Sequence, residues 1–320
     1  MFPALRHWLI AGQAAFVLSL AAISSRPIPF SFVRPMTAAM LLWVVGLTYF
    51  LVRSVIRSPG RPLSSMIAHC REERATIARA FEWALILGLA VALHGWAKTM
   101  IPHVTSYWAD PLLANLDHAI FGRDAWRLFR SELLGPVYAK AYVCWFFITF
   151  GVMGVLAFSK RDHSTLFNGF LVAWIGGGTV GQYVLPSAGP MFFERIGHGP
   201  RFEQLLATND PSYGRVADYL WKFHEAGGAG LGTGISAMPS MHVAMAVWTA
   251  LAARALWKPL TIPAIAYALV IYGASVSSGW HYATDGLVGL LVTLGAYRLC
   301  AAWSDRSVSQ RAAPLASQVA

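Results

Sequence analysis

Charged residues are scarce in this sequence. Only 12% of its 320 residues are Asp, Glu, Lys or Arg, whereas 56% are hydrophobic, and the mean hydropathy is +0.51. A soluble domain of this length carries about twice that share of charge. The composition therefore excludes an ordinary soluble globular domain and is typical of a polytopic membrane protein.

Acidic residues are scarcer than basic ones, with 15 Asp and Glu against 25 Lys and Arg, which gives a formal net charge of +10. Such a surplus can indicate nucleic-acid binding, but the arginines lie mostly between apolar runs and form no single stripe. We interpret them as topology signals and contacts to anionic lipids. The membrane is the predicted partner, and no nucleic acid is expected.

Cysteine is the third scarce residue. The three cysteines, Cys70, Cys144 and Cys300, have no CxxC or metal-ligand spacing, and two of them lie in or at the end of apolar runs. This pattern argues against a disulfide framework.

Long apolar runs are what the sequence has in abundance, and each run of roughly 17 to 20 residues can cross a bilayer once. They predict an all-α, polytopic membrane bundle of about eight spans. The first span could instead be a signal peptide, because small residues lie near Ser25, and we favour a retained span. The predicted spans are about Trp8–Ile23, Met36–Val52, Trp83–Ile101, Val137–Phe158, Leu166–Leu185, Met241–Trp257, Leu260–Val276 and Asp285–Ala302.

These spans divide the chain into three parts. Residues 1–79 hold two spans and a basic cytoplasmic loop, residues 80–303 hold the six-span core, and residues 304–320 are a predicted disordered tail. The core has two extracytoplasmic loops, 102–135 and 186–240. Within the first loop, Asp110–Gly122 places apolar residues at helical spacing, so we expect a helix lying on the membrane or packed over the bundle.

Counting spans brings three features to one membrane face: the end of the fifth span, His242, and the stretch from His281 to Asp285. By the positive-inside rule, short loops and span ends rich in Lys and Arg are cytoplasmic. The candidate site is therefore expected on the extracytoplasmic face. The opposite, cytoplasmic face receives fourteen of the 25 basic residues: Arg6, Arg53, Arg57, Arg61, Arg71, Arg74, Arg79, Lys160, Arg161, Arg254, Lys258, Arg298, Arg306 and Arg311.

Two short stretches, Ser236–His242 and Gly279–Asp285, each place a histidine at the start of an apolar span. Asp285 follows His281 by four residues, so in a helix the two share a face. Asp285 could then accept a hydrogen bond from one ring nitrogen of His281 and leave the other free. Such an oriented imidazole suits a nucleophile, and His242 could protonate the leaving group. The alternative is that both histidines are structural residues at the membrane interface.

Pro239 and Ser240 are expected to begin the helix that carries His242. The backbone N–H groups of its first turn and the Ser240 hydroxyl would form an anion-binding end. An ordinary serine N-cap would have the same sequence.

Together, the two histidine stretches resemble the second and third signature motifs of the type 2 phosphatidic acid phosphatase superfamily. Asp110–Gly122 and Leu185–Pro190 also look like the branch that contains the inositol phosphorylceramide synthases and their bacterial relatives. The resemblance covers about residues 80–302 as a six-helix core. It implies an integral protein of a bacterial inner (plasma) membrane.

The resemblance also implies a two-step phosphoryl transfer that uses no metal and no cofactor. His281 would be the nucleophile that forms a phosphohistidine, Asp285 would orient it, and His242 would protonate the leaving alkoxide. The implied partners are a phospholipid donor and either a lipid or water as acceptor.

Two features of the superfamily's phosphatases are missing. Ser275 stands where they have an arginine six residues before the third-motif histidine, and their first motif, a lysine seven residues before Arg-Pro, has no counterpart. A phosphate still needs cationic or N–H donors. We predict Arg195, Gly189 and Ser240 as phosphate-binding residues, with Lys98 and Arg201 as further candidates.

The predicted function is that of a lipid phosphotransferase similar to inositol phosphorylceramide synthase. The alternative enzyme is an extracytoplasmic phosphatase acting on a lipid phosphate or a polyprenyl diphosphate. A non-catalytic transporter or scaffold is a further alternative. It is disfavoured because transporters usually place charges inside their spans, and here the polar residues gather at one membrane face.

Overall fold

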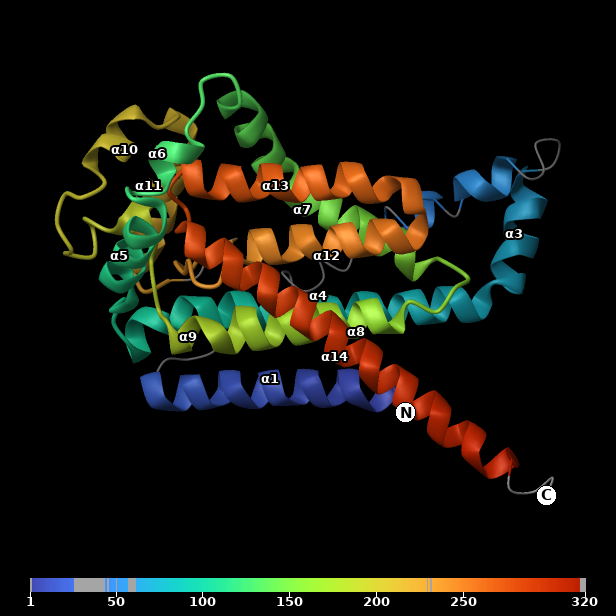
Figure 1. The fold of residues 1–320 in the computed structure, drawn as a ribbon. Helices are drawn as coiled ribbons and strands as arrows, with labels where there is room; N and C mark the ends of the chain where they lie inside the picture. The colour runs from blue at the N-terminus through green and yellow to red at the C-terminus, as the bar shows by residue number, and fades with distance from the viewer. Residues whose placement is uncertain are drawn as a thin grey trace.

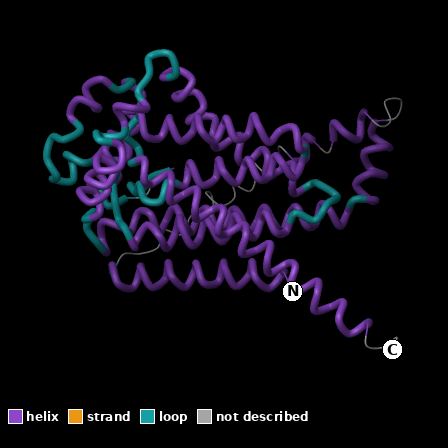
Figure 2. The backbone as a smooth tube through the Cα atoms, viewed as in Figure 1, coloured by secondary structure: helices purple, strands orange, loops and turns teal. Residues whose placement is uncertain are grey.

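The computed structural model describes residues 2–25, 44, 46–49, 51–56, 62–228, 230 and 232–316. Over these residues the chain forms helices joined by loops and contains no strand (Figure 2). The predicted all-α class is confirmed. In chain order, the helices of the described residues include α1 (Phe2–Ser24), α3 (Pro62–Glu72), α4 (Arg74–Val104), α5 (Ala109–Phe121), α6 (Trp126–Phe129), α7 (Gly135–Ala157), α8 (Ser164–Val172), the π-helix η1 (Ala173–Gly181), α9 (Gln182–Val184), η2 (Pro190–Phe192), α10 (Glu203–Thr208), α11 (Pro211–Glu225), α12 (Met241–Leu256), η3 (Lys258–Leu260), α13 (Thr261–Ser277) and α14 (Ala283–Ala316).

Within the described residues, five helical stretches are long and apolar enough to cross a membrane. Helix α12 is shorter but also apolar, and α8, η1 and α9 follow one another through the predicted fifth span. The chain is thus a polytopic helical membrane bundle, as predicted. The predicted span Met36–Val52 lies largely outside the described residues. The five long stretches are Leu5–Ser24, Arg74–Val104, Gly135–Ala157, Lys258–Ser277 and Ala283–Arg306.

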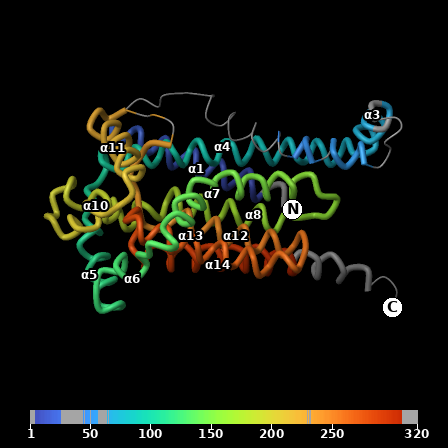
Figure 3. The backbone as a smooth tube through the Cα atoms, turned by 90° about the horizontal axis from the view of Figure 1, so that it is seen from above, coloured from blue at the N-terminus to red at the C-terminus, as the bar shows by residue number. Residues whose placement is uncertain are grey.

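The long helices lie side by side, and four of the shorter helices gather at one end of the bundle (Figures 1 and 3). Helices α5, α6, α10 and α11 cover that end, together with most of the loops, which Figure 2 draws in teal. Helix α3 and the C-terminal end of α14 lie at the opposite end. We call the end covered by the short helices the capped end.

Helix α5 confirms the predicted amphipathic segment and ends at Gly122, whose φ of 71° is left-handed. The buried positions Asp110, Leu113, Ala114 and Asp117 follow the i, i+3, i+4, i+7 spacing of one helix face. This face packs over the bundle end, while the apolar side chains of its other face remain exposed.

Small residues of the Gly176–Thr179 segment bring the central helices close together. A Cβ at Gly177 would lie 2.9 Å from Val292 of α14, and one at Gly178 would lie 3.1 Å from the sulfur of Met241 in α12. The π-helical segment η1 therefore packs directly against the two helices that flank the histidine stretches. Helix α14 continues to Ala316, into the tail that was predicted to be disordered.

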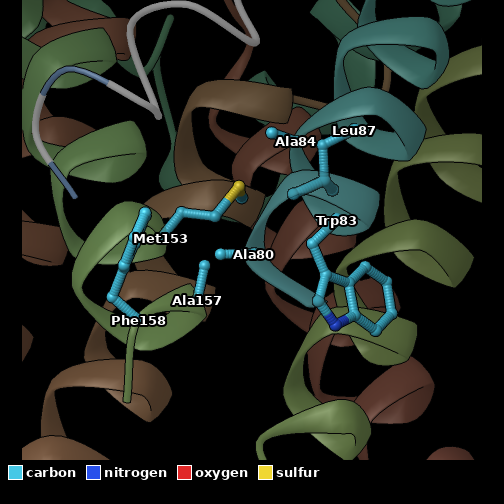
Figure 4. A pocket seen from close by; sticks show the side chains of 7 residues that line it. All are labelled: Ala80, Trp83, Ala84, Leu87, Met153, Ala157 and Phe158. Atoms are coloured by element: carbon cyan, nitrogen blue, oxygen red, sulfur yellow. The ribbon is translucent and has the colours of Figure 1, made fainter. Parts of the chain in front are cut away.

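An apolar pocket lies between α4 and α7 (Figure 4). Its position on α4, around Ala84, is fourteen residues before Lys98, which corresponds to about 21 Å along a helix. It therefore lies well away from the capped end and contributes no polar chemistry to the histidines. Its lining residues are Ala80, Trp83, Ala84, Leu87, Met153, Ala157 and Phe158.

Candidate active site

The two predicted histidines lie together at the capped end of the bundle. His242 is the second residue of α12, and His281 lies in the short turn between α13 and α14. Their ring centroids are 5.8 Å apart, with an interplanar angle of 62°. The order of the helices thus brings the two imidazole rings next to each other at this end of the bundle.

The His281 ring is oriented by a backbone carbonyl. Its Nδ1 lies 2.8 Å from the carbonyl oxygen of Ala237, and because a carbonyl only accepts, Nδ1 must carry the proton. The lone pair is then on Nε2. His281 is held in the tautomer that a nucleophile at Nε2 requires.

Asp285 lies close to His281, but in a different geometry from the one expected. His281 precedes α14 by two residues and is not part of it, so the i+4 helix relation does not apply. Asp285 Oδ2 is 3.5 Å from His281 Nδ1 and accepts the N–H of Tyr282 at 2.9 Å. Asp285 is fully buried, and the Ala237 carbonyl is the closer acceptor for the His281 Nδ1–H.

Burial sets the protonation state of His281. Removal from water lowers its pKa to about 3, a shift that the Ala237 hydrogen bond opposes and that the nearby charge of Lys98 reinforces. The ring is therefore neutral at neutral pH. A neutral imidazole with a free Nε2 lone pair is competent for nucleophilic attack.

The His242 ring is held by aromatic side chains of α7. Tyr142 stacks on it at 4.3 Å and Trp145 lies 4.5 Å away, both measured between ring centroids. The indole Nε1 of Trp145 also donates to the His242 carbonyl at 2.8 Å. Sequence reasoning assigned no role to these two aromatic residues, since the contact between α7 and α12 arises only on folding.

Ser240 is the N-cap of α12, as predicted. Its Oγ accepts the N–H of Val243 at 3.4 Å, and its own N–H donates to the carbonyl of Asp285 at 3.0 Å. Glycine at position 289 permits this approach, because a Cβ there would lie 2.5 Å from the Ser240 carbonyl oxygen. The first turns of α12 and α14 therefore start side by side, with the N-terminus of α12 beside the histidines.

The candidate cations differ in what they contact. Arg195 donates to Asp218 at 2.5 Å, and Arg201 donates through two nitrogens to Asp124. Lys98 of α4 makes no hydrogen bond or ion pair with the part of the chain that the structure describes. It lines a small pocket with His103, His224 and glycines of the loop after α11.

Gly189 and Ser275 fill structural positions. The N–H of Gly189 donates to Asp110 Oδ1 at 2.8 Å. Gly189 has a φ of +90°, and a Cβ at this position would lie only 2.6 Å from the carbonyl oxygen of Trp280. The Ser275 hydroxyl donates to the carbonyl of Tyr272 within α13. The Ser275 carbonyl accepts the N–H of His281 at 3.2 Å.

Two buried aspartates of α5 also reach the site. Asp110 accepts hydrogen bonds from the loop that carries Gly189, and Asp117 accepts them from the first residues of α14, directly after the His281 turn. Sequence reasoning singled out their helix but gave neither residue a role. The available signal was their spacing of seven residues, which places both on one face of a helix.

A family model described as the PAP2 superfamily matches residues 123–299. The match includes Ser240, His242, His281 and Asp285, and it begins after Lys98 and after α5. It does not single out the inositol phosphorylceramide synthase branch. No curated protein and no solved structure matches the chain. Because the matched region is more than half of the 320 residues and contains both histidines of the site, the chain belongs to the PAP2 superfamily.

Proposed function

We propose that the protein is a membrane-embedded lipid phosphotransferase, similar in activity to inositol phosphorylceramide synthase. It would take a phosphorylated group from one lipid through a phosphohistidine at His281 and deliver it to the hydroxyl of a second lipid. The observation that best supports this proposal is the neutral His281 ring, with Nδ1 bonded to Ala237 and Nε2 free, beside His242.

In the first step, His281 Nε2 attacks the phosphorus of the donor, and the bond from phosphorus to the leaving oxygen breaks. His242, in its protonated form, gives its proton to that oxygen. A bound phosphate favours this protonated form, since an anion next to an imidazole stabilises its positive charge. The Asp285 carboxylate stabilises the positive charge that develops on the His281 ring.

In the second step, neutral His242 takes the proton from an acceptor hydroxyl. The acceptor oxygen attacks phosphorus, the bond from phosphorus to Nε2 breaks, and His281 returns to its starting state. His242 ends protonated, ready for the next donor. The same geometry serves water as acceptor, and the enzyme would then be a phosphatase of lipid phosphates or polyprenyl diphosphates.

We propose Lys98 as the cation that binds the phosphate in place of the missing arginine. It makes no ion pair with the described residues, whereas Arg195 and Arg201 are both paired with aspartates. Its charge also reaches His281, whose pKa it helps to lower. The Ser240 hydroxyl and the N-terminus of α12 would supply further donors. Arg195 is a second candidate, but it would have to break its ion pair with Asp218 to bind the phosphate.

The experiment that tests this function uses purified protein in lipid micelles. Phosphatidylinositol, phosphatidic acid and a polyprenyl diphosphate are supplied in turn, with and without ceramide or diacylglycerol as acceptor. Free phosphate and new phospholipid are both measured. We expect a new phosphodiester lipid that requires the acceptor, and His281→Ala should abolish its formation, because the nucleophile is lost.

The controls separate the alternatives. Free phosphate released from a monoester or diphosphate, whether or not an acceptor is present, would identify a phosphatase. Equal turnover by wild type and His281→Ala would refute the nucleophile assignment. Lys98→Met should raise KM and lower kcat, while Lys222→Met, on α11, serves as the matched loss of a lysine from the same end of the molecule.

A further inference from the structure

Asp117 binds the backbone directly after the candidate nucleophile. Its two carboxylate oxygens accept the N–H of Ala283 at 2.6 Å and the N–H of Thr284 at 3.0 Å. These are first-turn N–H groups of α14, which have no partner within their own helix. A carboxylate from α5 therefore caps α14 and fixes its start two residues after His281.

Asp110 lies two helical turns earlier on the same face of α5 and contacts both sides of the site. Its Oδ1 accepts the Tyr282 hydroxyl and the Gly189 N–H, each at 2.8 Å, and its Oδ2 accepts the Ala188 N–H at 2.7 Å. Tyr282 is the residue that follows His281. Asp110 thus ties the His281 turn to the loop after α9.

That loop in turn holds the acceptor of the His281 ring. The Ser187 carbonyl accepts the N–H of Ala237 at 2.8 Å, and the Ser187 hydroxyl accepts the N–H of Met238 at 3.1 Å. The Ala237 carbonyl then accepts Nδ1–H of His281. Asp110 is therefore connected to the imidazole of His281 through three hydrogen bonds and the short pieces of backbone between them.

We propose that Asp110 and Asp117 are positioning residues, which act on phosphoryl transfer through His281 without touching substrate. Asp117 fixes the backbone after His281, and Asp110 fixes the carbonyl that orients its ring. Both lie on α5, before residue 123, where the family match begins. The proposal rests on the phosphotransfer function proposed above.

A purely structural role for the two carboxylates is the competing explanation. Burying a carboxylate is costly unless it is fully hydrogen-bonded, and both side chains are at most 3% exposed. Either role requires the hydrogen bonds to form. The two roles differ in what a variant loses. If the role is structural, the variant yields less folded protein; if it is positioning, the protein that does fold has a lower kcat.

The test uses Asp117→Asn and Asp110→Asn, which keep the side-chain shape but leave one oxygen to accept. Protein is purified in lipid micelles, and rates are normalised to the folded, monodisperse fraction. Misplacing a reacting group by about 1 Å can cost on the order of a hundredfold in rate, so we expect kcat to fall by roughly ten- to a hundredfold with KM nearly unchanged. Asp162→Asn is the matched control, because Asp162 accepts the N–H of Ser164 at 2.9 Å at the start of α8, at the opposite end of the bundle.

A second readout does not depend on turnover. The ¹⁵N chemical shifts of the histidine rings identify which nitrogen of His281 is protonated, with His281→Ala used to assign the signal. We expect a single Nδ1–H tautomer in wild type and a mixture of tautomers in Asp110→Asn. If wild type has no phosphotransfer activity, the proposed function fails while this measurement still tests the positioning.

The positioning proposal is overturned by either of two results. One is an unchanged kcat in the folded fraction of both asparagine variants. The other is a His281 tautomer that is the same in wild type and in Asp110→Asn. An equal loss of kcat in the Asp162→Asn control would also overturn it, since any lost helix cap would then have the same effect.

Discussion

At the scale of single residues, burial moves the pKa of two neighbouring groups in opposite directions. It lowers that of His281 to about 3 and raises that of Asp110 to about 6. The three hydrogen bonds to Asp110 oppose the increase, and the charge of Asp285 adds to it. Near pH 6, therefore, His281 is already neutral while Asp110 gains or loses its proton.

This difference predicts the acidic limb of the rate profile. Asp110 accepts three hydrogen bonds as a carboxylate, and protonation removes acceptor capacity from the network that orients His281. We expect kcat to reach its maximum above the pKa of Asp110 and to fall as the pH drops through about 6. The measurement is kcat between pH 5 and pH 8 with a phosphodiester donor, whose own phosphate does not titrate there.

Asp110→Asn is the diagnostic variant for that limb, because an amide does not titrate. Its kcat should be lower at every pH and should not fall further at acidic pH. A limb that persists unchanged in Asp110→Asn would assign the titration to another group and contradict the prediction.

At the scale of elements, the site depends on how closely α12 and α14 begin. The Ser240 N–H donates to the Asp285 carbonyl, and this contact needs glycine at position 289. Backbone cannot move aside as the far end of a side chain can, so a methyl group there must push the two helices apart. Since α12 carries His242 and α14 follows His281, any separation changes the distance between the two rings.

We therefore expect Gly289→Ala to lower kcat by at least about tenfold, because it would displace His242 and His281 relative to each other. Gly295→Ala is the matched control on the same helix, because a Cβ at Gly295 has no atom within 4 Å. It should leave kcat unchanged and slightly favour the helix. Equal kcat values for the two variants would argue against the helix spacing as a determinant of activity.

The elements also separate what the sequence could predict from what it could not. Apolar runs located α7 and α12 to within two residues at each end, because bilayer thickness and hydropathy act locally along the chain. The start of α14 was placed two residues too late, at Asp285. The helix begins at Ala283 because Asp117, 166 residues away, caps it, and such a contact has no local sequence signal.

At the scale of the whole molecule, the sequence predicted the two histidines but not the network behind them. His242 and His281 stand at the ends of apolar spans, so counting spans was enough to bring them to one face. The roles of Asp110, Asp117 and Ser187 depend on which backbone N–H groups meet them after folding. Lys98 was one of several candidate cations in the sequence, and only the fold shows that its charge lies near His281.

The orientation of the bundle in the membrane follows from its charge distribution. The end opposite the capped end carries basic residues close to the span ends, among them Arg6, Arg79 and Lys160, of which Arg6 pairs with Glu82 and Lys160 with Glu73. By the positive-inside rule we expect that end to be cytoplasmic. The capped end, with both histidines, should therefore face away from the cytoplasm.

Cysteine labelling tests this orientation in a variant whose three native cysteines, Cys70, Cys144 and Cys300, are replaced by serine. Glu132→Cys places a thiol at an exposed position between α6 and α7 at the capped end, and Arg161→Cys places one at an exposed position after α7, at the other end. In sealed, right-side-out vesicles, a membrane-impermeant maleimide should label position 132, while position 161 should react only after detergent is added. The reverse pattern would place the histidines on the cytoplasmic side and require a donor lipid from the inner leaflet.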